Sequence, residues 1–283
     1  MYTRGLKIFR NNMQQGRLTF IGLGLYDEKD ISLKGLEEIK KCDKVYAEFY
    51  TAKLTGTDIK KIEKKIRKKI EILSREETEK GDKILESATK ENVVFLTCGD
   101  PMTATTHIDL RLRAKNKGIE TRIIHGSSII TAAPGLLGLQ NYKFGRTTTL
   151  VFPEKEYFPT SPYQIIKGNK MMGLHTLVLL DIQAEKDRYM TANEGIKLLL
   201  EMEKKLGENV FNEDSIVCVV AHAGSSDPIL TANTAGFLRD KDFGPPLHTL
   251  VVPGNLHFME VEALVKLAGL PGELKLSKKI QKL

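Results

Sequence analysis

Short apolar runs alternate with amphipathic segments along the first half of the chain. The apolar runs are rich in β-branched and aromatic residues, and they predict strands over 17–25, 44–50, 92–98 and 119–125. Apolar residues spaced by three or four positions predict helices over 31–42 and 59–70. The capping-box spacing of Ser74 and Glu77 predicts the start of a helix over 74–90, and Gly118 marks the end of one over 105–118. Strands that alternate with helices are typical of a mostly parallel, doubly wound sheet.

The pattern changes after His125. Residues 126–140 are small, apolar and nearly uncharged, and they predict a buried helix that breaks around Pro134 and Gly135. We expect the join between two domains in this segment. Strand-like runs are more closely spaced beyond it, which favours a mixed sheet. They cover 147–152, 174–182, 215–224, 227–233 and 246–254, with helices over 191–206 and 256–268. Thr191 as cap and Glu194 three residues later predict the start of the helix over 191–206. The expected fold class is α/β, with two α/β domains, the first mostly parallel and the second mixed.

Charge separates a near-neutral body from two basic ends. Residues 1–17 and 274–283 each carry a net charge of +4 without an acidic residue, which leaves −1 on residues 18–273 out of a total of +7. We therefore expect a flexible extension (1–17), an N-terminal α/β domain (18–125), a C-terminal α/β domain (126–273) and a basic tail (274–283). Basic ends on a near-neutral body argue against a nucleic-acid groove through the fold.

The acid-free start has other interpretations. A transit peptide would be richer in serine than residues 1–17, and this segment runs directly into a strand. A flexible extension, or a true start at Met13, fits the composition better. The lysine-rich segment 59–70 also has two interpretations. Its isoleucines form one apolar helix face, so a solvated helix is expected, with a docking surface for an acidic partner as the alternative.

Hydropathy argues against a membrane-spanning protein, and cysteine usage argues against a metal-binding one. No apolar run approaches the roughly 18 residues that a membrane span needs. Cys42, Cys98 and Cys218 are scattered, and none forms a CxxC pair or lies near a histidine at ligand spacing. Scattered thiols favour a reducing compartment, hence the cytoplasm, and no metal site is expected.

The stretch GLGLYD, residues 22–27, resembles the start of a dinucleotide-binding fingerprint. Glu48 lies at about the distance along the chain where a ribose-binding acid would be expected. However, Asp27 occupies the place of the third glycine, and DEKDIS follows before any helix begins. A nicotinamide-dependent oxidoreductase is therefore a minor alternative. The remaining interpretation is a glycine turn that lets a ligand approach the backbone.

A second glycine-containing strand end is GDPMTATTH, residues 99–107. Asp100 could simply cap a turn or a helix near Thr103. Alternatively, this loop and GLGL lie side by side at the carboxyl edge of one sheet, where open α/β sheets bind ligands. The segments HGSSIITAAPG and VVAHAGSSDP add small residues and backbone groups to such a site.

No acid–base constellation accompanies these loops. The six histidines show neither HxH nor HExxH spacing, and neither a nucleophile elbow nor a phosphate-binding loop motif occurs. Glycine-rich strand ends without such a constellation favour group transfer from a reactive cofactor. The protein would then position the cofactor and the substrate, and the cofactor would supply the chemistry. A sulfonium methyl donor is the plainest example, because its methyl group is already activated.

The motifs resemble the tetrapyrrole-methylase-like family of S-adenosylmethionine-dependent methyltransferases, in its branch that modifies a protein. The resemblance runs from about Leu18 to Pro271. It rests on IGLGLYDEKDIS, VYAEFYT, GDPMTATTHIDL, IHGSSI, GLQNYKFG, YFPTSPY, GLHTLVLLDI, RYMTANE, GPPLHTLVVPG and LHFMEVEAL. The run LLDIQAEKDRYMTANE lacks the insertion associated with the eukaryotic branch, so an archaeal member is expected.

The resemblance implies a homodimer of two-domain subunits that bind S-adenosylmethionine in the cleft between the domains. It also implies translation elongation factor 2 as protein substrate. The amine of its 3-amino-3-carboxypropyl-histidine would be methylated repeatedly to give diphthine. The first amine is mostly protonated at neutral pH, so either desolvation or water must help to remove its proton.

The resemblance also implies the cofactor contacts. Asp100 would fix its loop and the polar end of the donor, whereas Thr103 is small enough to leave room for it. The sequence departs from the family pattern at His222, where arginine is expected, and at Ser127, where alanine is expected. No catalytic residue is assigned. The implied contacts are Leu25, Asp100, Thr103, Ser128, Ile129, Leu180, Ala223 and His248.

Two alternatives from other classes remain beside this implied function. One is a methyltransferase of the same fold that acts on a porphyrin-like small molecule, although YFPTSPY and RYMTANE match the protein-modifying branch. The other is a binding module for translation factors that uses the lysine-rich helix over 59–70.

Overall fold

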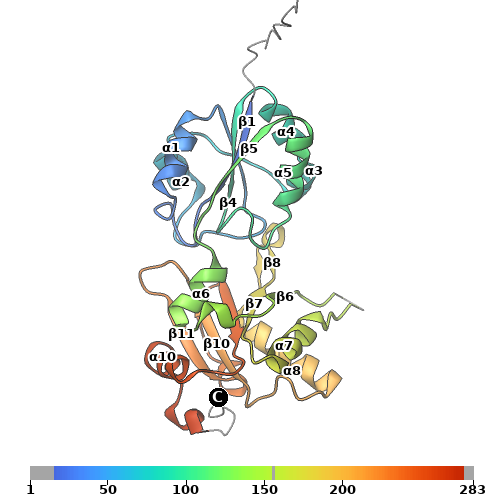
Figure 1. Ribbon diagram of the computed structural model, residues 1–283, viewed down its shortest axis with the longest axis vertical. Coiled ribbons are helices and arrows are strands. Elements are labelled where there is room, and N and C mark those ends of the chain that lie inside the picture. The colour runs from blue at the N-terminus through green and yellow to red at the C-terminus, as the bar shows by residue number, and fades with distance from the viewer. Residues whose placement is uncertain (1–15, 155–156, 277–283) are drawn as a thin grey trace, which may run out of the picture.

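Two five-stranded sheets, each with helices on both faces, make up the computed structural model, which describes residues 16–154 and 157–276. Figure 1 shows one sheet above the other, joined by the segment between β5 and α6. The extension expected over 1–17 and the tail expected over 274–283 lie mostly outside the described residues. Within those residues, none of the helices combines the length and apolar character needed to cross a bilayer.

The first sheet has the strand order β3-β2-β4-β1-β5, and all its pairings are parallel, as the sequence predicts. Figure 1 shows α1 and α2 on one face and α3, α4 and α5 on the other. The strands are β1 (Arg17–Gly22), β2 (Lys44–Glu48), β3 (Glu71–Ile72), β4 (Asn92–Thr97) and β5 (Glu120–Ile124). The helices are α1 (Leu33–Lys41), α2 (Ile59–Ile66), α3 (Arg75–Lys80), α4 (Asp82–Ala88) and α5 (His107–Asn116).

Alternation along β4 shows how the sheet is covered on both faces. Val94 and Leu96 belong to the core beneath α1 and α2, whereas Val93 and Phe95 belong to the core beneath α4 and α5. Successive side chains of a strand point to opposite faces, and here both faces are buried. This double burial is why the strands of the first sheet are near-continuous apolar runs in the sequence.

The second sheet is mixed, with the order β11-β10-β12-β7-β6; β6 pairs parallel with β7 and the other pairings are antiparallel. The core on one face includes residues of α7, α8 and α9, and the core on the other includes residues of α6 and α10. Its strands are β6 (Thr148–Leu150), β7 (Thr176–Leu180), β10 (Ile216–Ala221), β11 (Ile229–Thr234) and β12 (His248–Val252). Its helices are α6 (Ile129–Leu137), α7 (Ser161–Met171), α8 (Ala192–Leu206), α9 (Ala235–Leu238) and α10 (Phe258–Ala268). A short hairpin of β8 (Ile182–Gln183) and β9 (Arg188–Tyr189) follows β7.

The helix predicted over 74–90 is wrong in its extent, because two helices occupy this segment. The capping box between Ser74 and Glu77 is present and starts α3 as predicted. Gly81 then adopts a left-handed conformation with φ 66°, which ends α3 before α4 begins. The predicted helix over 59–70 likewise ends early, at Ile66, because Arg67 has φ 57°. Its buried residues are Ile62 and Ile66.

The break predicted around Pro134 and Gly135 is also wrong. Helix α6 continues through Pro134 and ends at Gly138, which has φ 70°. Proline removes one hydrogen bond from a helix interior. Here Pro134 is buried on the same helix as Ala133 and Leu137, so packing offsets that loss. Sequence reasoning missed α7 entirely, although proline near a helix start is a known signal and Pro162 lies in its first turn.

Candidate active site between the two sheets

The carboxyl ends of β1 and β4 are joined by their glycine loops. Gly24 and Gly99 exchange two backbone hydrogen bonds, Gly24 N–H to Gly99 O at 3.3 Å and Gly99 N–H to Gly24 O at 2.6 Å. Both glycines have positive φ, 82° and 68°. A Cβ atom added at Gly22 would lie 2.4 Å from Gly99 O and 2.6 Å from Gly126 N. The prediction that the GLGL and GDP loops lie side by side at one sheet edge is confirmed.

Asp30 holds the first loop, which sequence reasoning did not foresee. Its Oδ2 accepts hydrogen bonds from Leu25 N–H at 3.0 Å and Tyr26 N–H at 2.7 Å. Aspartate commonly bonds nearby backbone amides in glycine turns, so its place in DEKDIS was an available signal.

Glu48 does not provide the ribose-binding acid that a nicotinamide site would need. It is fully buried and accepts hydrogen bonds from Tyr50 N–H, Thr51 N–H and Thr51 Oγ1. Burial raises the pKa of this carboxyl above its usual value, against the hydrogen bonds that it accepts. The oxidoreductase alternative therefore loses the acidic residue on which it depended.

Asp100 organises the second loop. Its Oδ1 accepts hydrogen bonds from Met102 N–H at 2.9 Å and Thr103 Oγ1 at 3.2 Å, and its Oδ2 lies 2.7 Å from His125 Nδ1. Burial acts to raise the pKa of Asp100, but the hydrogen bonds from Met102 and His125 outweigh it and hold the pKa below its usual value. The alternative of a helix cap near Thr103 is wrong, because α5 begins only at His107.

Two histidines approach the same region from the second sheet. His248, at the start of β12, accepts a hydrogen bond from Ala192 N–H at its Nδ1, at 3.1 Å, so its Nε2 can donate to Pro245 O, also at 3.1 Å. Burial lowers the pKa of His248. His222 follows β10 with φ 53°, and its Nε2 lies 2.7 Å from the same Pro245 oxygen.

A cavity of about 310 Å³ lies between these loops of the two sheets. All eight residues expected at the cofactor line it: Leu25, Asp100, Thr103, Ser128, Ile129, Leu180, Ala223 and His248. Of the two departures from the family pattern, His222 lines the cavity and Ser127 does not. The lining also contains residues that sequence reasoning missed, namely Tyr50, Lys53, Arg75, Asp181 and Met190. A polar residue after an apolar strand, as in LVLLD, was an available signal for Asp181.

The lining suits a ligand with one polar and one apolar part. Asp100, Thr103 and Ser128 offer a carboxylate and hydroxyl groups, whereas Ile129 and Met190 offer apolar surface. S-adenosylmethionine combines an amino-acid part and a sulfonium centre with an aromatic base, so these residues fit it. Leu180 belongs both to the core of the second sheet and to the lining of the cavity. The described part of the chain contains no group of three histidine, cysteine or acidic residues that could hold a metal.

Comparison with known families decides the assignment. The family described as Tetrapyrrole (Corrin/Porphyrin) Methylases matches residues 17–238, well over half of the chain. The chain belongs to the tetrapyrrole methylase family.

Individual relatives of this methylase are named diphthine synthases. The diphthine synthase of Methanococcus aeolicus is 55% identical over 244 residues, which cover 86% of this chain and 95% of that protein. The diphthine synthase of Methanosphaera stadtmanae is 52% identical over 257 residues, which cover 91% of this chain and 98% of that protein. A crystal structure of diphthine synthase matches with a TM-score of 0.83 at 40% identity, covering 91% of this chain and 98% of that chain. The methylase is therefore an S-adenosylmethionine-dependent methyltransferase of diphthamide biosynthesis, with the predicted α/β fold.

Proposed function

We propose that this methylase transfers methyl groups repeatedly to the amine of 3-amino-3-carboxypropyl-histidine on translation elongation factor 2, giving diphthine. The similarity to enzymes named diphthine synthase over most of both chains supports this substrate. The observation that carries the location of the reaction is that all eight expected residues line one cavity. It lies where the carboxyl ends of β1 and β4 meet the ends of β7 and β10.

The same eight residues are our proposal for the donor site. The carboxylate of Asp100 and the hydroxyl groups of Thr103 and Ser128 would hold the polar part of the donor. When bound, S-adenosylmethionine supplies a methyl group activated by the positive charge on its sulfur. The residues of the chain orient the donor and exclude water.

Mass spectrometry tests this function directly. Elongation factor 2 that carries the aminocarboxypropyl-histidine is incubated with the methylase and the donor, and its mass is expected to rise by successive methyl groups. Methylation of a porphyrin-like small molecule instead would favour the alternative substrate class. Stoichiometric binding to elongation factor 2 without any mass change would favour the binding module.

We also propose that the methylase is a homodimer. Large apolar side chains are exposed on and near α10, namely Tyr142 at 80%, Phe258 at 69%, Met259 at 53% and Leu267 at 52%. Large exposed apolar side chains mark protein interfaces when they form one patch. Light scattering is expected to give about twice the 31.7 kDa mass of the chain. A species of one chain mass at micromolar concentration would contradict the dimer.

Two further parts of the proposal concern location and boundaries. The methylase would act in the cytoplasm, because translation supplies its substrate there. The boundary between the two domains would lie after His125, between the end of β5 and the start of α6. Limited proteolysis that cuts between the two sheets while leaving each intact would support this boundary.

A further inference from the structure

Two carboxylates line the cavity, and they differ in how much of their hydrogen-bonding capacity is used. Both oxygens of Asp100 are occupied, by Met102 N–H, Thr103 Oγ1 and His125 Nδ1. Because these contacts already use both oxygens, Asp100 is less suited than Asp181 to accept a proton, although its carboxylate still lines the proposed donor site. The second carboxylate, Asp181, comes from the other sheet.

Asp181 is held by one oxygen only. It directly follows β7, is half-buried, and its Oδ2 accepts hydrogen bonds from Phe152 N–H at 3.0 Å and Gln183 Nε2 at 3.2 Å. Across residues 16–154 and 157–276, no hydrogen-bond partner is recorded for its Oδ1. The carboxylate is thus anchored in position while one oxygen stays available to a ligand in the cavity.

Other side chains of the lining are poorly suited to accept a proton. Burial, followed by the charge of Glu48, raises the pKa of Tyr50 to about 12. Burial also raises the pKa of the Cys98 thiol. The two ring nitrogens of His248 are both occupied. His222 retains one nitrogen, because its Nε2 lies at hydrogen-bond distance from Pro245 O.

Cationic side chains also lie at or near the cavity. Lys53 and Arg75 line the cavity from the first sheet's side. Arg188 of β9 lies over the ring of Phe152, with its guanidinium carbon 3.5 Å from the ring centroid. None of the three lies within ion-pair distance of Asp181, and Arg75 pairs instead with Glu79. The available carboxylate therefore shares the cavity with Lys53 and Arg75, which could hold the carboxyl group of the substrate.

From this geometry we infer that Asp181 is a catalytic residue that binds the protonated substrate amine and removes one proton before each methyl transfer. This inference rests on the proposed function. In the step, an N–H bond of the ammonium breaks, its electron pair stays on nitrogen, and the proton forms an O–H bond with Asp181 Oδ1. The proton then leaves to solvent, which returns the carboxylate for the next amine. Leu180, an expected donor contact, is the preceding residue, so the amine would lie next to the donor.

The test compares the full-length wild type with Asp181→Asn. Asparagine keeps the shape and can still accept from Phe152 N–H, but it takes no proton at neutral pH. We expect kcat/KM on aminocarboxypropyl elongation factor 2 to fall by about 100-fold, the lower end for lost general-base catalysis. Between pH 6 and 8 the variant's rate should rise about tenfold per pH unit, because it needs an amine already deprotonated by solvent, whereas the wild-type rate should rise less steeply.

Binding measurements provide a readout that does not depend on turnover. Calorimetry at pH 7 should show unchanged donor affinity for Asp181→Asn and about tenfold weaker binding of the modified elongation factor. Asp181→Glu should restore part of the rate and the shallower pH profile. Asp187→Asn is the matched control, since Asp187 is exposed on the β8–β9 turn, lies outside the lining and has φ 47°, which asparagine tolerates.

The outcomes separate the two proposals. If the wild type does not methylate elongation factor 2, the proposed function is wrong. If the wild type does and Asp181→Asn keeps its rate and pH profile, the assignment of Asp181 is wrong and the free nitrogen of His222 becomes the proton acceptor to examine. Should Asp181→Asn lose its cooperative melting, Asp181→Ser takes its place, and a wild-type pH profile in that variant would equally overturn the inference.

Discussion

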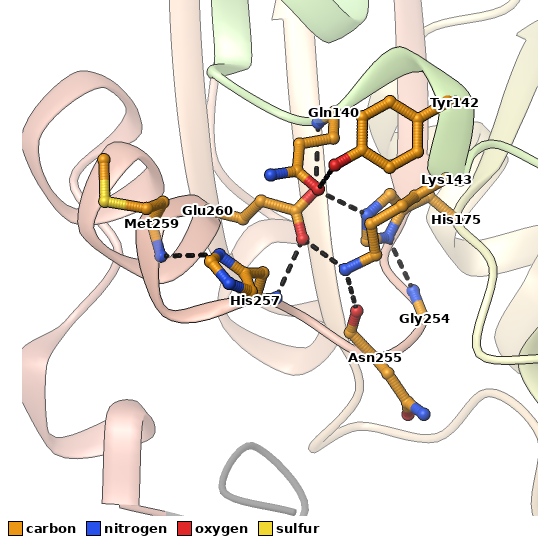
Figure 2. Close-up of polar contacts among 9 residues, drawn as sticks. All are labelled: Gln140, Tyr142, Lys143, His175, Gly254, Asn255, His257, Met259 and Glu260. Atoms are coloured by element: carbon orange, nitrogen blue, oxygen red, sulfur yellow. Dashed lines mark hydrogen bonds and ion pairs between the residues drawn. The ribbon is translucent and has the colours of Figure 1, made fainter. Parts of the chain in front are cut away.

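Glu260 and His175 form a buried hydrogen bond at the end of the second sheet opposite the cavity. Glu260 Oε1 lies 3.0 Å from His175 Nε2, and both residues are fully buried. Gly254 N–H donates to His175 Nδ1 at 3.0 Å, so the imidazole carries its proton on Nε2 and donates it to the carboxylate. Figure 2 shows these side chains and their partners.

The same carboxylate joins segments that are far apart in the sequence. Its Oε1 also accepts from Gln140 N–H at 2.9 Å, and its Oε2 accepts from Lys143 Nζ at 2.5 Å and His257 N–H at 2.8 Å (Figure 2). Glu260 thereby connects the segment after α6, the start of β7 and the first turn of α10. Removing one partner from such a buried network leaves the others unsatisfied.

We predict that Glu260→Gln destabilises the fold strongly. The amide is neutral and leaves Lys143 without its buried counter-charge, so the free energy of unfolding should fall by about 3–5 kcal/mol in urea denaturation. The matched control is Glu201→Gln on α8, whose exposed pair with Lys205 should contribute less than about 1 kcal/mol. Equal losses in the two variants would show that the network adds no stability of its own.

The stability of the wild type should depend on pH through the same residue. Burial acts to raise the pKa of Glu260, but the hydrogen bonds from His175 and Lys143 outweigh it and lower the pKa to about 2. A lowered folded pKa contributes stability above the unfolded value, and this stability is lost as pH falls from about 4.5 to about 2. The contribution is of the order of 3 kcal/mol, at about 1.4 kcal/mol per pKa unit.

The measurement is urea denaturation of the wild type and Glu260→Gln at pH 7 and pH 3. The difference between the two proteins should shrink at the lower pH, because Glu260 then takes up a proton in the unfolded wild type but stays mostly ionised in the folded one. A difference that stays constant would contradict the assigned pKa.

We predict that Asp100→Ala weakens binding of S-adenosylmethionine by 10- to 100-fold, measured by calorimetry on folded protein. A hydrogen bond to a charged group contributes about 1.5–3 kcal/mol, which corresponds to that range. The alternative is that Asp100 only shapes its turn. In that case the variant would lose about 1 kcal/mol of stability and bind the donor as the wild type does.

Thr103→Trp should exclude the donor by filling part of the cavity. Thr103 lines the cavity and is only half-buried, so the larger side chain can be accommodated without overpacking the core. Donor affinity should fall at least tenfold while the melting temperature changes little. Thr106→Trp is the control, since Thr106 is exposed, makes no capping hydrogen bond and lies outside the lining. Equal donor affinity in both variants would place the donor elsewhere.

Local patterns in the sequence determined most of the secondary structure. The strands of the first sheet were predicted because burial on both faces makes each an uninterrupted apolar run. The capping boxes that start α3 and α8, at Ser74 and Thr191, were also predicted, because each needs only two residues three positions apart. The adjacency of the GLGL and GDP loops followed from the rule that parallel strands end at one edge.

Only the tertiary structure decided features that depend on distant partners. Pro134 continues a helix because of the packing around it, and Gly81 divides one predicted helix because the chain turns there. The availability of Asp181 and the burial of Glu260 are likewise set by residues far along the chain, from Phe152 to Asp181 and from Gln140 to Glu260. Helix caps and strand patterns depend on residues close together in the sequence, so the sequence alone predicts them. The burial and hydrogen bonding of a carboxylate depend on residues from distant segments, which come together only when the sheets have folded.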